Sequence, residues 1–402
     1  MRTGKKYQND AVKAQFEVMW DNIWQKLFCP ETNLFYDDLA ENELFKHLPT
    51  PEEIALQFPN PCGWGTGMED SMLNAGNMLI TSLNRFDAEG KECFADAARK
   101  VFAGMSLCAS VGSTQGYLAR SVSPADGRSF YINSSRDQYT HFVYSAYVYY
   151  THKLCSDAEK SRIRQHLTDF AERALKNVTP ETGYDLLRDD DQVGMVCQMD
   201  GELSPHEAMR LGMIYLAAWK VSNDERFLQA YLKGRERWMA MTESINFEHN
   251  WIAYELLQMQ YSLRLVWMLD DDSAIKNRLQ KIMRQIADYA RKFARDFNQK
   301  LQAGEVDTSI ENPPWRKRPH TYLRVCNGYA YIVPFLDQDF LDKNFKPQRE
   351  TGEGIIIQQL CPGYDVPEEQ IQFLLDMAMT QNFQELNCYA PILMADAYYA
   401  LK

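Results

Sequence analysis

The most restrictive feature of this 402-residue sequence is a regular alternation between two kinds of helical segment. Segment 157–176 surrounds a narrow apolar stripe with charged residues, which is typical of a helix with one face in water. Segment 250–270 carries only Glu255 and Arg264 as charged residues before its closing Asp270, and it is apolar on nearly every side. A helix of the second kind must be covered by other helices on most of its surface.

Helical periodicity and helix breakers divide the chain into about twelve such segments, with almost no β-alternation. They cover residues 9–28, 68–84, 91–107, 136–152, 157–176, 204–221, 223–243, 250–270, 272–299, 327–343, 367–380 and 389–401. Two concentric rings of six helices, with the chain stepping between them, produce this order, whereas every helix of a simple bundle keeps a wet stripe. The sequence therefore predicts an all-α (α/α)6 toroid that occupies residues 1–402 as a single domain.

Composition excludes several classes of function. A formal net charge of −12 has the wrong sign for a protein that follows phosphates, so we expect no nucleic-acid partner. The nine cysteines are odd in number and form no C-x-x-C pair, which favours free thiols. No apolar run of membrane-spanning length occurs and the start of the chain has no signal-peptide pattern, so we expect no membrane partner and a cytoplasmic or, for a trimmed chain, periplasmic location. Oligomeric state is not predicted.

Chemistry-bearing residues gather just before the apolar segments. If the inner helices of a toroid run parallel, the loops that precede them meet at one mouth. Acids, histidines, arginines and tryptophans occupy these stretches, which are residues 63–70, 134–141, 200–207, 248–251, 316–324 and 385–389. Helix capping explains acids at single helix starts, but it explains less well the same mixture at six starts.

Several common site motifs are missing. The triplet Gly63, Gly65 and Gly67 lacks phosphate-loop spacing, and its expected role is to let the backbone pass close to a ligand beside Trp64. His206-Glu207 is an isolated dipeptide rather than a zinc helix. We therefore expect neither a metal nor a cofactor.

One stretch resembles a known family. Glu69-Asp70-Ser71-Met72-Leu73-Asn74, entering a helix of small residues, is similar to the Asp-containing helix entry of (α/α)6 glycosidases such as the unsaturated glucuronyl hydrolases. That resemblance implies a second essential carboxylate at a later inner-helix start, for which Asp137 is the candidate. The surrounding residues 136–141 depart from the family pattern, and toroid polysaccharide lyases share the architecture.

The leading hypothesis is a glycoside hydrolase that acts on an oligosaccharide or polysaccharide containing a uronate. Asp70 and Asp137 are the expected catalytic carboxylates, one kept protonated and the other ionised. Further catalytic candidates are Glu69, Glu202, Glu207 and His206. The expected substrate-binding residues are Trp64, Trp251 and Tyr322 for stacking on sugar rings, Arg136, Arg318 and His320 for an acidic substituent, and His141 and His249.

Three alternatives remain open from the sequence. A lyase would use His141, His206, His249 or a tyrosine as base, with Arg136 or Arg318 neutralising the uronate. A non-catalytic sugar-binding toroid would keep its ligand affinity after substitution of both aspartates. An epimerase of free sugars would need a histidine pair, which is not recognisable in this sequence.

Overall fold

The computed structural model of the chain describes residues 10–37, 45–318, 321–326, 329–334 and 336–401. Within them, six helices pack side by side in a closed ring. The ring contains, in chain order, α3 (Ser71–Glu89), α5 (Arg136–Thr151), α7 (Arg210–Ser222), α9 (Ala253–Leu269), α11 (Lys346–Leu360) and α13 (Pro391–Tyr399). Each helix contacts the next, and α13 returns to contact α3. The predicted (α/α)6 toroid is thereby confirmed.

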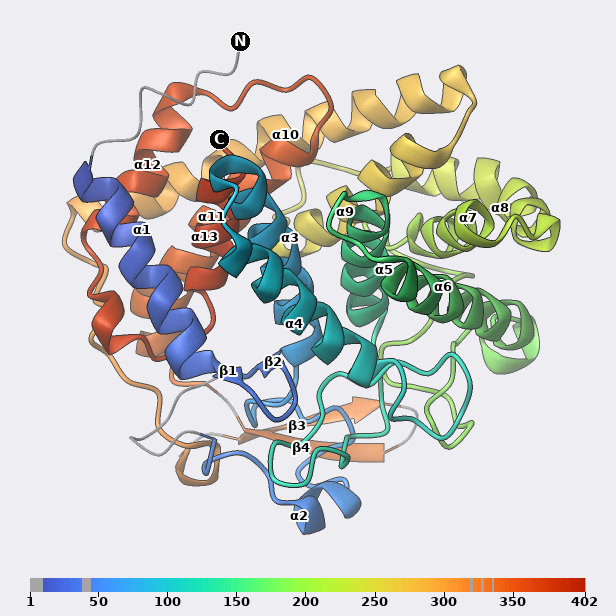
Figure 1. Cartoon of the computed structure of the whole chain (residues 1–402), viewed down its shortest axis with the longest axis horizontal. Coiled ribbons are helices and arrows are strands. Elements are labelled where there is room, and N and C mark those ends of the chain that lie inside the picture. The colour runs from blue at the N-terminus through green and yellow to red at the C-terminus, as the bar shows by residue number, and fades with distance from the viewer. Residues whose placement is uncertain (1–9, 38–44, 319–320, 327–328, 335, 402) are drawn as a thin grey trace.

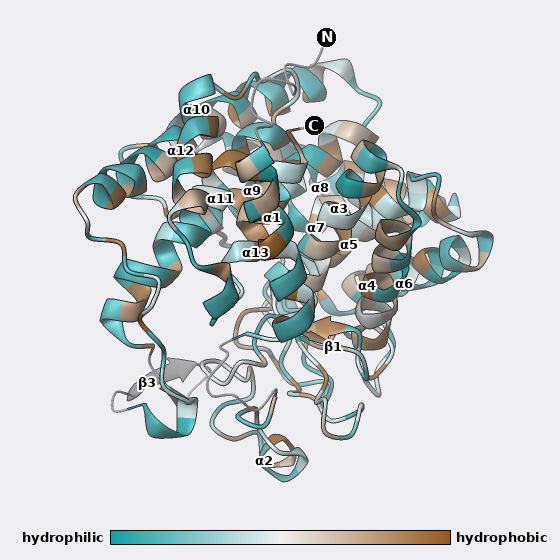
Figure 2. Cartoon of the chain, turned by 60° about the vertical axis from the view of Figure 1, so that its left-hand side comes forward, coloured by the Kyte–Doolittle hydropathy of each residue, from teal (hydrophilic) through white to brown (hydrophobic). Residues whose placement is uncertain are grey.

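A second set of helices packs around this ring (Figure 1). It consists of α1 (Asp10–Asn22), α4 (Glu92–Cys108), α6 (Asp157–Asn177), α8 (Glu225–Glu243), α10 (Ser273–Gln302) and α12 (Glu368–Met379). α4 lies on α3, α6 on α5 and α7, α8 on α7, α10 on α9 and α11, and α12 and α1 on α13. Figure 2 shows both hydrophilic and hydrophobic residues along outer helices such as α10, as expected for helices with one face in water.

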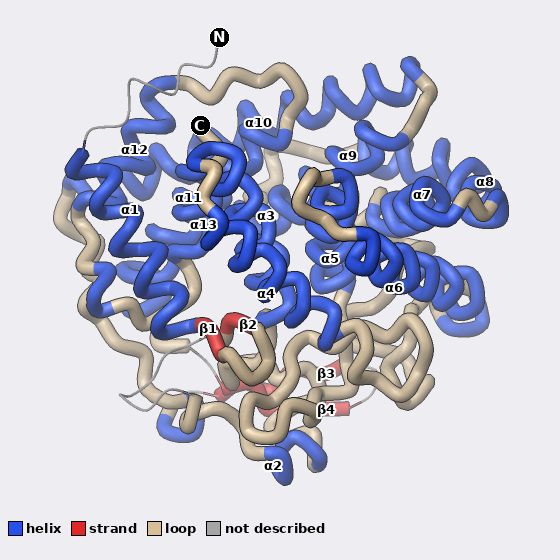
Figure 3. The backbone as a smooth tube through the Cα atoms, in the orientation of Figure 1, coloured by secondary structure: helices blue, strands red, loops and turns tan. Residues whose placement is uncertain are grey.

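Strands and most long loops gather at one end of the ring (Figure 3). Two short antiparallel pairs lie there, β1 (Phe28–Cys29) with β2 (Leu34–Phe35) and β3 (Thr321–Cys326) with β4 (Tyr329–Pro334). The short helix α2 (Pro51–Ala55) lies at the same end. This end is the mouth of the toroid, because the inner helices begin there.

Side chains cap the starts of several helices. The outer helix α6 begins with a capping box, in which Ser156 and Glu159 bond to each other's backbone N–H groups. The outer helix α10 is capped by Asp272, which accepts from Ala274 N at 2.9 Å. The inner helix α3 also has an acid, Asp70, at its N-cap position, but this side chain makes no capping hydrogen bond. The Asp70 carboxyl group is therefore available for other contacts.

The predicted helix over 327–343 is wrong. Residues 329–334 form β4, and a π-helical turn covers Phe340–Phe345. Pro334 falls inside the predicted segment, where a proline breaks the hydrogen-bonding ladder of a helix. The fifth inner helix is instead α11, which the sequence analysis did not predict, and the stretch 316–324 leads into β3 rather than into an inner helix.

The remaining predicted helices are present with boundaries shifted by a few residues. The largest shifts are the start of α7 at Arg210 instead of residue 204 and the end of α1 at Asn22 instead of residue 28. Among the described residues, no helix is both long enough and apolar enough to cross a bilayer.

Candidate active site

A cavity of about 290 Å³ opens at the mouth of the ring. It is lined by Asp37, Glu69, Asp70, Ile252, Tyr254, Leu336, Leu341, Phe345, Lys346, Arg349, Glu350, Glu353 and Tyr389. Residues at or just before the starts of α3, α9, α11 and α13 line this cavity, and Asp137 of α5 and Arg210 of α7 are joined to it through Tyr254. The inner helices therefore point the same way and bring their first turns together, as the parallel arrangement predicts.

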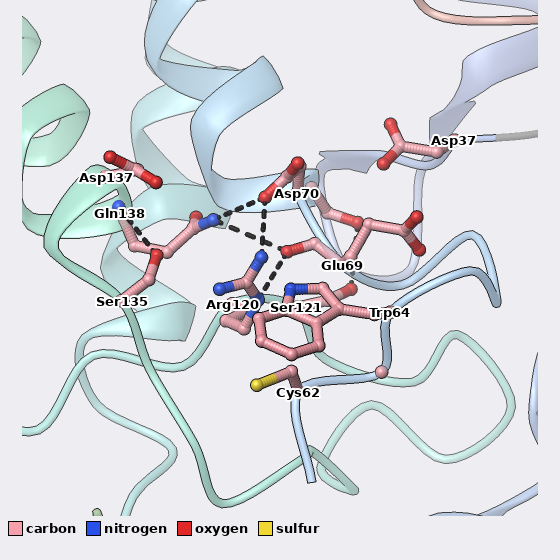
Figure 4. A network of polar contacts seen from close by, with 12 residues as sticks. Asp37, Cys62, Trp64, Glu69, Asp70, Arg120, Ser121, Ser135, Asp137 and Gln138 are labelled. Atoms are coloured by element: carbon pink, nitrogen blue, oxygen red, sulfur yellow. Dashed lines mark hydrogen bonds and ion pairs between the residues drawn. The ribbon is translucent and has the colours of Figure 1, made fainter. Parts of the chain in front are cut away.

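Asp70 is held by two donors from neighbouring segments (Figure 4). Its Oδ1 accepts from Arg120 Nη2 at 2.9 Å and from Gln138 Nε2 at 2.8 Å. Arg120 is buried and also donates from Nε to the backbone oxygen of Glu69 at 2.7 Å. Both donors meet the same oxygen, so Oδ2 of Asp70 has no hydrogen-bond partner among the described residues.

Asp137 has a different environment, although it lies one residue before Gln138. It sits in the first turn of α5, where Ser135 caps the helix by accepting from Gln138 N. One carboxylate oxygen accepts from the buried guanidinium of Arg210, the first residue of α7. The other accepts from the hydroxyl group of Tyr254 in the first turn of α9. Both oxygens therefore accept hydrogen bonds that favour the ionised form.

These surroundings shift the pKa values of the two acids in opposite directions. Burial raises the pKa of Asp70, and the nearby Arg120 only partly opposes this rise. Burial would also raise the pKa of Asp137, but Arg210, the Tyr254 hydroxyl group and Arg136 outweigh it and lower that pKa to about 2. The charge of Asp137 itself contributes to the raised pKa of Asp70, so the two groups interact. One acid is disposed to keep a proton and the other to remain charged.

Glu69 lines the cavity but is bound to the glycine-rich loop. Its carboxylate accepts from the backbone nitrogens of Gly65, Thr66 and Gly67 at 3.1, 3.2 and 2.9 Å. Gly65 has a positive φ, and a Cβ there would come within 2.3 Å of the Pro334 backbone oxygen. The loop thus passes close to β4, and Glu69 holds it in that conformation. Trp64 lies beside Arg120, whose guanidinium carbon is 5.9 Å from the centre of the indole ring.

Glu207, His206 and Arg136 form a second polar group near Asp137. Glu207 forms an ion pair with Arg136 and accepts from Ser204 N at 3.1 Å. His206 Nδ1 is 2.8 Å from the Ser204 hydroxyl oxygen. Burial lowers the pKa of His206 to about 3, with the positive charge of Arg210 acting in the same direction. His206 is therefore neutral at ordinary pH.

The other predicted binding residues differ in how deeply they are buried. Trp251 is buried, and its ring lies edge to face with those of His206 and His249 at centroid distances of 5.6 and 4.6 Å. His249 is exposed, and Glu202, one of the further catalytic candidates, lies in the turns before α7. His141 is buried inside the ring, where Nε2 is 2.8 Å from Gln258 Nε2.

Arg318 binds the backbone of two loop segments. It is buried and donates to the backbone oxygens of Gly65 at 2.6 Å and Pro313 at 3.1 Å. His320 and the side chain of Tyr322 lie outside the described residues. The roles assigned to all of these residues stay predictions.

The sequence analysis missed several cavity or network residues, among them Arg120, Arg210, Tyr254, Arg349 and Glu353. Arg349 Nε donates to Glu353 Oε1 at 2.8 Å, and its guanidinium carbon is 4.8 Å from the centre of the Tyr254 ring. Burial raises the pKa of Glu353 to about 7 against the opposing charge of Arg349. The signal that could have revealed this pair is an acid between two glycines, Gly352-Glu353-Gly354, directly before three isoleucines.

The described residues contain no group of three or more His, Cys, Asp or Glu side chains arranged to hold a metal ion.

Comparison with known proteins gives matches in structure only. No protein-family profile and no curated protein matches the sequence. An α-1,6-mannanase from Salegentibacter sp. is 11% identical, with a TM-score of 0.47 over 98% of this chain and 100% of that one. A cellobiose 2-epimerase from Spirochaeta thermophila is 10% identical, with a TM-score of 0.42 over 92% of this chain and 85% of that one.

A sugar epimerase from a ruminal bacterium is 12% identical, with a TM-score of 0.47 over 91% of this chain and 85% of that one. These similar structures are enzymes that act on sugars, as are the families that the sequence resembles. At 10 to 12% identity and TM-scores of 0.42 to 0.47, these similarities do not extend to an activity for this chain.

Proposed function

We propose that this protein is a glycoside hydrolase in which Asp70 is the general acid and Asp137 is the ionised carboxylate. The observation that carries the proposal is the pair of acids at adjacent inner-helix starts, whose environments push their pKa values apart. Glycosidases commonly need one carboxylic acid to protonate the leaving oxygen and one carboxylate to act at the anomeric carbon.

The hydrogen bonds of Asp70 assign its proton to one atom. Because Arg120 and Gln138 both donate to Oδ1, the acidic proton belongs on Oδ2. From there it passes to the glycosidic oxygen as the bond to the anomeric carbon breaks. Positive charge then develops on the sugar ring, and the Asp137 carboxylate stabilises it. The configuration of the released sugar distinguishes attack by Asp137 itself from attack by a water molecule that Asp137 activates.

The charges of the cavity support an uncharged sugar rather than a uronate. Five of its lining residues are acids and only Lys346 and Arg349 are basic. The arginines expected to bind a uronate are engaged elsewhere, Arg136 with Glu207 and Arg318 with backbone oxygens. We therefore propose a neutral oligosaccharide as substrate, and Tyr254 and Tyr389 provide aromatic groups at the cavity wall.

The lyase alternative has weaker support. A tyrosine base must lose its proton, but the Tyr254 hydroxyl group donates to Asp137, and burial raises the pKa of this tyrosine well above its ordinary range. His141 is buried beside Gln258, and burial lowers its pKa to about 3, which makes it a weak base. Neither residue is well suited to remove a proton from a bound uronate.

The test is incubation of the protein with a panel of neutral oligosaccharides and, separately, uronate polysaccharides. We expect new reducing ends from at least one neutral substrate, no ultraviolet absorbance from an unsaturated uronide, and loss of turnover in Asp137→Asn with unchanged folding. Unsaturated products from a uronate polysaccharide, or full activity of Asp137→Asn, would refute the proposal.

A further inference from the structure

Glu353 has an unused hydrogen-bonding atom at the bottom of the candidate site. Its side chain is 2% exposed, and the residue lines both the main cavity and a smaller, deeper one. Oε1 is bonded to Arg349, whereas Oε2 is buried and has no hydrogen-bond partner among the described residues. A buried carboxylate oxygen without a partner is costly, so its retention in a cavity points to a ligand that supplies a donor.

The backbone around Glu353 is fixed by close helix packing. A Cβ at Gly352 would come within 2.5 Å of the Leu393 carbonyl carbon in α13. A Cβ at Gly354 would come within 3.2 Å of the Ala290 oxygen in α10. α11 is therefore held tightly on both sides, and Glu353 cannot withdraw from the cavity by a shift of its helix. Its carboxylate is a preorganised acceptor.

The same carboxylate disfavours an anionic ligand. Asp70, Glu69 and Glu350 line the cavity with Glu353, and Arg349 already pairs with Glu353. A sugar hydroxyl group can donate to Oε2, whereas a uronate carboxylate can only accept and would be repelled. The requirement of Oε2 for a donor and the excess of acids therefore favour the same class of ligand.

We propose that Glu353 determines specificity by accepting a hydrogen bond through Oε2 from one ring hydroxyl group of a neutral sugar, and by rejecting sugars that carry a carboxylate. This inference rests on the proposed function, because it concerns the same cavity, but it is a statement about binding rather than turnover. Arg349 acts as a positioning residue, since it holds Oε1 and so leaves Oε2 as the acceptor for the ligand.

The experiment measures dissociation constants by calorimetry at about pH 8, above the pKa of about 7 of Glu353, so that its carboxylate is ionised. The ligands are the methyl glycosides of glucose, mannose and galactose, the monodeoxy analogues of the one that binds best, and methyl glucuronide. Each is titrated into the wild-type protein, Glu353→Gln and Glu369→Gln. Glu369 is exposed on α12, so its variant controls for the loss of one negative charge.

We expect the wild-type protein to bind a neutral glycoside at least tenfold more tightly than the glucuronide, and to lose at least tenfold on removal of one particular hydroxyl group. In Glu353→Gln, removal of that hydroxyl group should weaken binding by less than about threefold; we call this loss of affinity the deoxy penalty. The ratio of affinities for the neutral glycoside and the glucuronide should shrink at least tenfold. Glu369→Gln should behave as the wild type. A purely structural role of Glu353 would weaken all ligands alike and leave these ratios unchanged.

Equal wild-type affinity for the best-binding neutral glycoside and for the glucuronide would overturn the inference even if Glu353→Gln failed to fold. Unchanged deoxy penalties in a folded Glu353→Gln would overturn it as well, and would indicate that something other than a sugar, such as a water molecule, satisfies Oε2. If the ratios change as expected but no glycoside is ever hydrolysed, the inference stands and the proposed hydrolase function fails. If hydrolysis occurs and the ratios do not change, only the inference fails.

Discussion

Replacement of Asp70 by Asn tests the central assignment, because Asn has the shape of a protonated Asp. The amide oxygen can keep the two hydrogen bonds from Arg120 and Gln138, and the amide NH2 group takes the place of the Oδ2 hydroxyl group. The substitution also removes a carboxyl group whose ionised form is disfavoured by burial, as its raised pKa indicates. We therefore expect Asp70→Asn to lower the free energy of unfolding at pH 7 by less than Asp137→Asn, which leaves the buried Arg210 without its carboxylate partner.

The effect on the rate should depend on the leaving group. General acid catalysis contributes about 100-fold to 10,000-fold, or about 2.7 to 5.4 kcal/mol of the barrier. For an oligosaccharide, whose leaving alcohol needs the proton, kcat/KM of Asp70→Asn should fall by this factor. For a dinitrophenyl glycoside of the same sugar, whose leaving group departs without a proton, it should fall by less than about tenfold.

Asp137→Asn is the matched variant, since it makes the same change at the other acid. It should lose activity on both substrates, because the charge that Asp137 provides is needed for either leaving group. Steady-state kinetics on the two substrates and urea unfolding of each variant complete the assay. The reasoning is refuted if Asp70→Asn loses both activities equally while folded, or if the two variants show the same dependence on the leaving group.

Three further predictions concern pH and stability. Tyr254→Phe removes a hydrogen bond that favours ionised Asp137, so the acidic limb of the kcat/KM profile should move to higher pH; an unmoved limb would show that another group controls it. Gly352→Ala brings a Cβ within 2.5 Å of the Leu393 carbonyl carbon and should cost about 1 to 3 kcal/mol, measured as a lower urea midpoint; wild-type stability would contradict this packing.

Burial raises the pKa of Asp396 from 3.8 to about 7 in the folded state, so its contribution to stability is complete below about pH 4 and is lost as pH rises toward 7. Asp396→Asn should flatten this part of the stability profile, and an unchanged slope in urea unfolding between these pH values would argue against it.

Much of the ring of helices was predictable because the burial of a helix determines which of its faces are apolar in the sequence. α9 is enclosed by other helices and is apolar on nearly every side, whereas α6 faces water and carries charges on its outer face. The same rule failed for α11, which is buried and yet polar in its first turns. Arg349 and Glu353 face a cavity rather than packed side chains, so hydropathy made an inner helix look like a loop.

The site was predictable in part for a related reason. Parallel inner helices must begin together, so acids at their starts could be assigned to one mouth without coordinates. The different surroundings of Asp70 and Asp137 could not, since they depend on Arg120 and Arg210, which lie 50 and 73 residues away along the chain. No local pattern connects an acid with a partner at such a separation.

The closure of the ring between α13 and α3 also bears on how the chain acquires its structure. The aromatic ring of Phe16 in α1 stacks on that of Tyr398 in α13 at a centroid distance of 3.7 Å. The Tyr399 hydroxyl group donates to the backbone oxygen of Phe16 at 3.2 Å. Contacts between residues so distant in the sequence raise contact order and slow folding. In a nascent chain of this protein, the side of α3 that packs on α13 therefore stays uncovered until α13, the last inner helix in chain order, has been synthesised.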